Sequence, residues 1–167
     1  MNNNIILIGF MASGKTTIGK LLSEKLCMDF IDTDYYIEDK EKISIKYIFE
    51  NYGEDYFRKV ESNTLKYLID KKNIVISTGG GIINSRENID LLKKIGTIIF
   101  LDTPQIEIKK RLENSTNRPL NKSNKFVEAL YKKRYDSYFY SADIIIKSST
   151  SVEACNKIIY KLNEKTR

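Results

Sequence analysis

Histidine is absent from this chain of 167 residues, and cysteine is rare, with only Cys27 and Cys155. Without an imidazole, any proton transfer must use a carboxylate, a lysine, a tyrosine or water. The two cysteines show no CxxC spacing. We therefore expect both to be buried free thiols of a protein in a reducing compartment, the cytoplasm.

Long apolar runs are also missing, and none approaches the roughly 20 residues that a membrane-spanning helix needs. The first four residues lack the basic segment of a signal peptide. The formal net charge is +6, but lysines are mixed with acidic residues, as in Glu38-Asp39-Lys40-Glu41-Lys42. This mixture is typical of a solvated surface rather than of a basic stripe. We expect neither a membrane nor a nucleic acid as partner, although a mildly positive chain would attract small anions.

No internal repeat, low-complexity tract or linker divides the chain, so we expect a single domain over residues 1–167. Short apolar runs alternate with amphipathic helical patterns. Strands are predicted at residues 5–8, 30–31, 74–76, 98–101 and 144–146. The continuous apolar run over residues 5–8 is typical of a strand buried on both faces. The pattern predicts an α/β fold with three layers, α/β/α, in which helices cover both faces of a five-stranded parallel sheet.

A phosphate-binding motif follows the first strand, because Gly9-Phe10-Met11-Ala12-Ser13-Gly14-Lys15-Thr16 matches G-x-x-x-x-G-K-[ST]. Its glycines let backbone N–H groups wrap around an anion at the positive end of a helix. We expect Lys15 to reach the β- and γ-phosphates of a nucleoside triphosphate and the Thr16 hydroxyl to bind Mg²⁺. A chance glycine turn would not need all four specified positions between a strand and a helix.

Two carboxylates, Asp32 and Asp34, follow the second strand. Residues two apart on an extended chain point to the same face, so both side chains can face the phosphate loop. One could hold magnesium, and the other could accept the proton of an attacking hydroxyl. Alternatively, an aspartate could cap the helix that follows, which accounts for one of the pair but not for both.

Other candidates are less specific. Arg58 and Glu61 lie three apart on a helical pattern, and this spacing alone favours a surface ion pair over a substrate anchor. The triplet Gly79-Gly80-Gly81 ends the third strand, and three glycines are better explained by a loop that a ligand approaches closely than by a simple turn. The polar stretch from Asn114 to Asn124 contains Arg118, and it could be a flap over the transferring phosphate or only a connector.

Taken in order, these motifs resemble the shikimate kinase family of P-loop kinases, and the similarity runs from the first strand to the last. The family's order is GxxxxGKT, D-T-D, F-R-x-x-E, G-G-G, R-P-L, R-x-x-x-Y and A-D. In this sequence they are Gly9–Thr16, Asp32–Asp34, Phe57–Glu61, Gly79–Gly81, Arg118–Leu120, Arg134–Tyr138 and Ala142-Asp143. The phosphate loop occurs in many families, whereas the aspartate pair, FRxxE and GGG in this order are much more specific.

The resemblance implies a P-loop kinase fold with a mobile lid over residues 112–124 and a substrate-binding region over residues 33–61. It implies transfer of the γ-phosphate of ATP to the 3-hydroxyl of shikimate, on the route to aromatic amino acids. One Mg²⁺ per subunit would accompany ATP, and the protein would be a monomer.

The resemblance also implies roles for individual residues. Asp34 contacts the acceptor hydroxyl and acts as the base, Arg118 closes from the lid, and Arg111 lies beside the nucleotide base. Both Arg58 and Arg134 hold the carboxylate of shikimate. The implied sites are, for catalysis, Asp34, Lys15 and Arg118; for shikimate, Asp34, Arg58, Gly79, Gly80, Gly81 and Arg134; for ATP, Ala12, Ser13, Gly14, Lys15, Thr16, Thr17, Arg111 and Arg118; and for the metal, Thr16 and Asp32.

Two other hypotheses remain open from the sequence. A related kinase such as gluconate kinase shares the loop and the chain length, and gluconate is also a hydroxylated carboxylic acid. The chain could instead be a non-catalytic nucleotide-binding module that kept the fold. Against a loss of catalysis, the chain keeps the residues that the reaction would need, Lys15, Thr16, Asp32 and Asp34.

Overall fold

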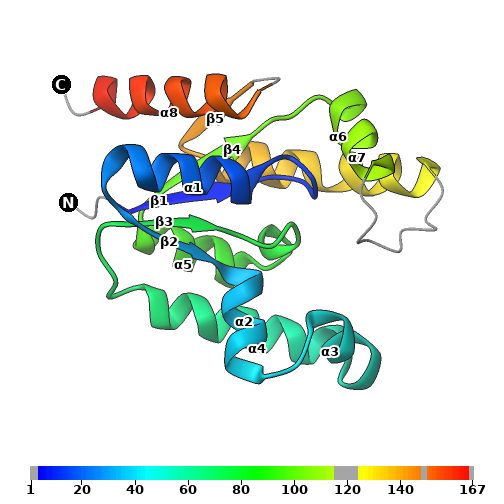
Figure 1. The fold of residues 1–167 in the computed structure, drawn as a ribbon. Coiled ribbons are helices and arrows are strands. Elements are labelled where there is room, and N and C mark those ends of the chain that lie inside the picture. Colours follow the sequence, from blue (N-terminus) through cyan, green and yellow to red (C-terminus); the bar gives the residue numbers. More distant parts are fainter. Residues whose placement is uncertain (1–3, 115–123, 148–149, 166–167) are drawn as a thin grey trace.

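A five-stranded parallel sheet forms the centre of the molecule, as predicted (Figure 1). The computed structural model describes residues 4–114, 124–147 and 150–165. The strands run in the order β2-β3-β1-β4-β5, and every neighbouring pair is parallel. Their bounds are β1 Ile5–Ile8, β2 Asp29–Asp32, β3 Ile74–Ser77, β4 Thr97–Leu101 and β5 Ile144–Ile146.

Helices cover both faces of this sheet, which confirms the three-layer α/β/α prediction. Helices α1 and α8 lie on one face, and α4, α5 and α7 lie against the other (Figure 1). In the described part of the chain the helices are α1 Lys15–Leu26, α2 Thr33–Glu41, α3 Ile45–Asn51, α4 Gly53–Leu68, α5 Arg86–Ile95, α6 Gln105–Glu113, α7 Asn124–Ser141 and α8 Ser151–Lys165, with a 3₁₀ turn at Ile82–Asn84.

The alternation of side chains along β1 explains why its sequence is continuously apolar. Ile6 and Ile8 point into the core on the side of α4, α5 and α7, whereas Ile5 and Leu7 point into the core beneath α1 and α8. A central parallel strand has no solvent face, so both sets of positions must be apolar.

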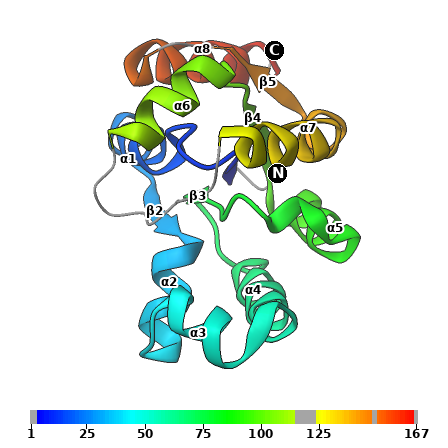
Figure 2. The ribbon, with the colours of Figure 1, turned by 90° about the vertical axis from the view of Figure 1, so that its right-hand side faces the viewer.

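Helices α2, α3 and α4 form a lobe below the β2 side of the sheet (Figures 1 and 2). It has a small core of its own, in which Ile37, Ile48 and Phe57 are buried together. Gly53 separates α3 from α4 and has φ 79°, a left-handed value that glycine adopts without steric strain. This conformation lets one helix end and the next begin within two residues.

The cysteine prediction is half correct. Cys155 is a buried free thiol in the core beneath α8. Cys27 is also free, but it is exposed, because it caps the end of α1 in a left-handed conformation with φ 52°. Such a cap is usually glycine and lies at the surface where the chain leaves the helix. Within the described ranges, no helix combines the length and apolar content of a bilayer span.

Asn4 lies where the strands begin, at the end of the sheet opposite their carboxyl ends, and it links the segments that lead into β1, β3 and β4. Its side chain is 1% exposed. Its amide donates to Lys71 O at 2.7 Å and to Ile95 O at 3.1 Å, and it accepts from Ile74 N at 3.1 Å.

We predict that Asn4→Ala lowers the free energy of unfolding by about 2–4 kcal/mol, because it leaves buried backbone groups without partners. Urea denaturation measures this change. Asn51→Ala is the control, since Asn51 makes a single exposed bond to Tyr47 O and its loss should cost less than about 0.5 kcal/mol. Equal effects of the two substitutions would contradict the prediction.

Candidate active site

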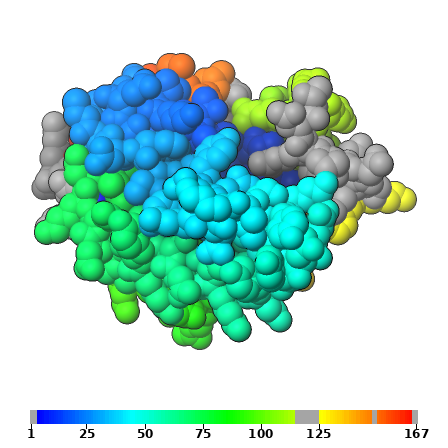
Figure 3. Space-filling view, turned by 60° about the horizontal axis from the view of Figure 1, so that its bottom comes forward, coloured from blue at the N-terminus to red at the C-terminus, as the bar shows by residue number. Residues whose placement is uncertain are grey.

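A cavity of about 640 Å³ lies at the carboxyl ends of the strands. Figure 3 shows the hollow, where the blue N-terminal segment is recessed between the cyan α2–α3 region and the yellow-green helices. The carboxyl ends of a parallel sheet are where ligands of this fold class bind. The cavity is lined by the phosphate loop, the end of β2, the glycine loop after β3, and parts of α3, α4, α6 and α7.

The phosphate loop is folded around its own lysine. Lys15 is 8% exposed, and its Nζ donates to Gly9 O at 2.8 Å and Phe10 O at 2.9 Å. Gly14 is the N-cap of α1 with φ 95°, so the first N–H groups of the helix face the cavity end of the loop. Arg111 on α6 donates to Ala12 O at 3.1 Å and holds the loop from outside. The loop and its lysine therefore present the N–H groups and the positive charge that an anion-binding site needs.

One carboxylate links the phosphate loop to the second strand. Asp32 is the last residue of β2, and its Oδ2 accepts from the Thr16 hydroxyl at 2.7 Å. Its Oδ1 accepts from the backbone N–H of Asp34 at 3.1 Å and so caps α2. The capping interpretation is therefore confirmed for Asp32, and its role at a metal stays a prediction. The extended geometry that we assumed for the pair is wrong, because Asp34 lies in the first turn of α2.

The glycine loop has no side chains because functional groups pack against its backbone. A Cβ added at Gly79 would lie 2.7 Å from Asp34 Oδ1. A Cβ at Gly81 would lie 2.6 Å from Arg58 Nη2. Neither distance is possible between unbonded atoms without movement, so a side chain here would displace a functional group. The protein's own side chains approach this loop closely, and the predicted approach of a ligand stays a prediction.

Arg58 is held between two carboxylates of α4. Its Nη1 donates to Glu61 Oε2 at 2.9 Å and its Nη2 to Glu54 Oε1 at 2.9 Å. Burial opposes the charge of Arg58, but Glu61 and Glu54 outweigh it and raise the pKa of the guanidinium. Because Glu61 is 1% exposed, the surface ion pair that the spacing favoured is wrong. Burial also raises the pKa of the Glu61 carboxyl, although Arg58 opposes this shift.

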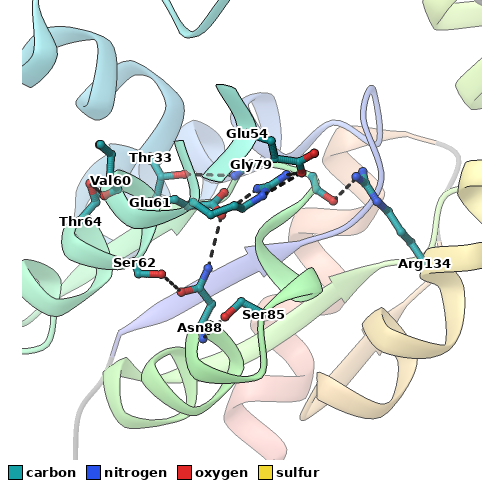
Figure 4. A network of polar contacts seen from close by, with 12 residues as sticks. Thr33, Glu54, Val60, Glu61, Ser62, Thr64, Gly79, Ser85, Asn88 and Arg134 are labelled. Carbon is teal, nitrogen blue, oxygen red and sulfur yellow. Dashed lines mark hydrogen bonds and ion pairs between the residues drawn. The ribbon is translucent and has the colours of Figure 1, made fainter. Parts of the chain in front are cut away.

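The helix α7 brings a second arginine to the glycine loop (Figure 4). Arg134 Nη1 donates to Gly80 O at 3.2 Å, and the Tyr138 hydroxyl donates to the same oxygen. Burial raises the pKa of Tyr138 to about 12, so this hydroxyl stays protonated as a donor at neutral pH. Two more tyrosines of this helix bond to Asp102, which follows β4. The Tyr131 hydroxyl donates to Asp102 Oδ1 at 3.3 Å, and the Tyr135 hydroxyl donates to Oδ2 at 3.2 Å.

Most predicted site residues meet at this cavity. It is lined by Ala12, Gly14, Lys15, Thr16, Thr17, Asp32, Asp34, Arg58, Gly79, Gly80, Gly81, Arg111 and Arg134. Ser13 does not line it, because its side chain is buried behind the loop. Arg118 and most of the predicted lid, at residues 115–123, lie outside the described residues.

Sequence reasoning missed an apolar wall of the cavity. Ile45, Phe49 and Phe57 line it, although the helical spacing of these residues predicts only core packing. Phe57 does both, since it is buried in the small core of the α2–α4 lobe and also borders the cavity. No sequence signal separates these positions from ordinary core positions. Asp102 was also missed, because a single acid after a strand does not stand out.

Comparison with known proteins supplies the family. The family model described as "Shikimate kinase" matches residues 11–163, nearly the whole chain. A curated shikimate kinase from Persephonella marina is 45% identical over 146 residues, which are 87% of this chain and 88% of that protein.

The chain belongs to the shikimate kinase family.

Solved structures agree with this assignment and with the P-loop kinase fold. The shikimate kinase from Acinetobacter baumannii in complex with shikimate has a TM-score of 0.91 at 34% identity, covering 99% of this chain and 95% of that chain. The shikimate kinase from Aquifex aeolicus has a TM-score of 0.82 at 40% identity, covering 98% of each chain. The protein is therefore a shikimate kinase and not a gluconate kinase or a nucleotide-binding module without catalysis.

We predict that two alanine substitutions in the glycine loop of this shikimate kinase have separate kinetic effects. Gly79→Ala displaces the Asp34 carboxylate and should lower kcat on the order of 10- to 100-fold. Gly81→Ala displaces the Arg58 guanidinium and should mainly raise KM for shikimate. Both should fold with a loss below about 2 kcal/mol, because the displaced atoms are ends of flexible side chains. Steady-state kinetics that remain unchanged in both variants would contradict the packing described above.

Proposed function

We propose that this shikimate kinase transfers the γ-phosphate of ATP to the 3-hydroxyl of shikimate within the cavity at the strand ends, with Asp34 as the base. The observation that supports this is the shared cavity of Lys15 and Asp34, one from the phosphate loop and one from the start of α2. An anion site and a carboxylate that open into the same cavity can bring a phosphate and a hydroxyl together. Positioning of this kind can supply much of the rate of phosphoryl transfer.

At the nucleotide end, the backbone N–H groups of residues 12–17 bind the phosphates. Lys15 exchanges its bonds to Gly9 O and Phe10 O for bonds to phosphate oxygens, which compensates its partial burial. Arg111, which already contacts the loop at Ala12 O, lies beside the base. Arg118 would close over the phosphates from the lid at residues 112–124.

Thr16 and Asp32 fit a magnesium site. Their oxygens lie 2.7 Å apart beside the phosphate loop, and hydroxyl and carboxylate oxygens are the donors that Mg²⁺ prefers. When bound with ATP, one Mg²⁺ per subunit would neutralise phosphate charge. In the described residues no group of three or more His, Cys, Asp or Glu side chains could hold a metal alone, so the phosphates would complete the site.

At the acid end, Arg58 and Arg134 hold the carboxylate of shikimate. Guanidinium groups bind carboxylates with two parallel hydrogen bonds, which fixes orientation as well as position. The apolar wall of Ile45, Phe49 and Phe57 would face the carbon ring. Because these side chains come from α3 and α4, residues 33–61 form the substrate-binding region of a single domain.

The chemical step follows from these positions. As the 3-hydroxyl oxygen bonds to the γ-phosphorus, the bond from phosphorus to the β-γ bridging oxygen breaks and ADP leaves. Asp34 takes the hydroxyl proton and later releases it to water. Lys15 and the loop N–H groups stabilise the charge on the phosphate oxygens. The protein would work as a monomer, as the resemblance to the family implies.

A coupled ADP-release assay tests this function. We expect turnover with shikimate, ATP and Mg²⁺, loss of turnover when EDTA removes the metal, and none with gluconate in place of shikimate. Detection of the product as shikimate 3-phosphate by NMR places the phosphate on the correct oxygen. ADP release that does not depend on shikimate would refute the proposal.

We predict that Asp34→Asn lowers kcat by about 100-fold or more, because the amide cannot accept the hydroxyl proton. ATP binding, measured by calorimetry, should stay within about threefold, since the phosphate loop is unchanged. The control is Asp39→Asn, because Asp39 is exposed and pairs with Lys42 at the surface. This variant should leave kcat unchanged. A normal kcat in Asp34→Asn would remove this residue from the mechanism.

A further inference from the structure

Asn88, in the first turn of α5, is a buried polar residue that lies outside the cavity. It is 0% exposed, and its backbone N–H donates to the Ser85 hydroxyl, which caps the helix. Burying an amide side chain costs free energy unless its donors and acceptors are bonded. Its partners therefore show what the amide contributes.

The side chain of Asn88 bridges two residues of α4 (Figure 4). Its Oδ1 accepts from the Ser62 hydroxyl at 2.6 Å, and its Nδ2 donates to Glu61 Oε2 at 3.4 Å. That same carboxylate oxygen accepts from Arg58 Nη1 at 2.9 Å. One oxygen of Glu61 thus joins Asn88 on α5 to the arginine in the cavity.

The other oxygen of Glu61 lacks this support. Oε1 is buried and has no hydrogen-bond partner among the described residues. It lies on the side of Gly79, where an added Cβ would be 3.4 Å from it and 2.7 Å from Asp34 Oδ1. A carboxylate whose hydrogen bonds all go to one oxygen is less restrained about its last bond than one held at both oxygens. The donors on Oε2 must fix its orientation, and Asn88 is the donor that comes from outside α4.

A purely structural role would be to join α4 to α5. The Ser62–Asn88 bond alone does that, and apolar residues of the same size would do it without burying polar atoms. The amide N–H turned toward Glu61 adds a second link between these helices. Unlike the first, it also restrains the carboxylate that holds Arg58.

We propose that Asn88 is a positioning residue for shikimate binding: it orients Glu61, which in turn orients the Arg58 guanidinium toward the substrate carboxylate. This inference rests on the proposed role of Arg58 as a carboxylate anchor. Asn88 does not line the cavity and acts only through Glu61.

The charge of Glu61 gives this role a measurable signature. Charged groups face Glu61 from three helices, with Arg58 on α4, Asp34 on α2 and Arg134 on α7. Burial raises the pKa of Glu61, and a hydrogen bond donated to the carboxylate favours its charged form. Removing the Asn88 donor therefore raises this pKa further. Protonated Glu61 holds Arg58 less well, so the loss of shikimate affinity on acidification should begin at a higher pH in the variant.

The test is calorimetric titration of the whole chain with shikimate between pH 5 and 8. The chain lacks tryptophan, so heat is a better signal than intrinsic fluorescence. We expect Asn88→Leu to raise the Kd for shikimate about tenfold at pH 7, the size of one hydrogen bond to a charged group. The loss of shikimate affinity on acidification should begin at a higher pH in this variant than in the unsubstituted protein. The Kd for ATP should change by less than twofold. Asn88→Asp keeps the acceptor for Ser62 but adds a like charge, and it should weaken shikimate binding further.

Three further variants make the result decisive. Ser85→Ala removes the cap of α5 without touching Glu61, so it should lower the melting temperature and leave the Kd for shikimate unchanged. In a Glu61→Gln background, Asn88→Leu should have little additional effect, because the residue acts through Glu61. The third variant, Arg58→Ala, measures how much shikimate affinity is lost when the carboxylate anchor itself is removed.

Different outcomes separate this inference from the proposed function. If Arg58→Ala weakens shikimate binding and neither Asn88 variant does, Asn88 has only a packing role and the inference is wrong. An additive effect of Asn88→Leu in the Glu61→Gln background also overturns it. If Arg58→Ala binds shikimate normally, the anchor of the proposed function is wrong and this inference falls with it. If Asn88→Leu does not fold, Asn88→Asp decides.

Discussion

The bare backbone of Gly79, Gly80 and Gly81 is the constraint on which the site depends. Asp34 packs against the first glycine, Arg134 and Tyr138 bond to the carbonyl of the second, and Arg58 packs against the third. These side chains come from helices that are far apart in the sequence. Asp34 and Arg58 reach the loop only because Gly79 and Gly81 carry no side chain. The loop, at the end of β3 beside β1, thus sets where the acid end of the cavity lies relative to the phosphate loop.

The positive charge of Arg58 is paired with a buried negative charge. In the proposed function Arg58 contacts the substrate, and the buried Glu61 accepts a hydrogen bond from its guanidinium and orients it. A buried carboxylate is costly, and its raised pKa reflects that cost. Apolar residues at these positions would be more stable, but they could not orient a guanidinium. Burying Glu61 therefore lowers stability but orients the Arg58 guanidinium. Such orientation matters in an enzyme that has no histidine and relies on the placement of charges.

Much of the fold could be predicted because its signals are local. The apolar run of β1, the alternation of strands and helices, and Gly53 between two helices each reflect backbone and burial rules that act over a few residues. The strand order could not be read in this way, since β2 and β3 pair across more than 40 residues. Cys27 was assigned to the interior from its residue type, although helix capping placed it at the surface.

For the site, the sequence by itself determined the phosphate loop and its chemistry, because the motif and its flanking elements are contiguous. The order of motifs also identified the family. Only the tertiary structure decided that Glu61 is buried behind a partly exposed Arg58, since i,i+3 spacing says nothing about what covers the helix. It also decided that Ile45 and Phe49 face a cavity and that Asn88 contacts Glu61. Such contacts join separate helices, and the packing of those helices, rather than any local pattern, brings the residues together.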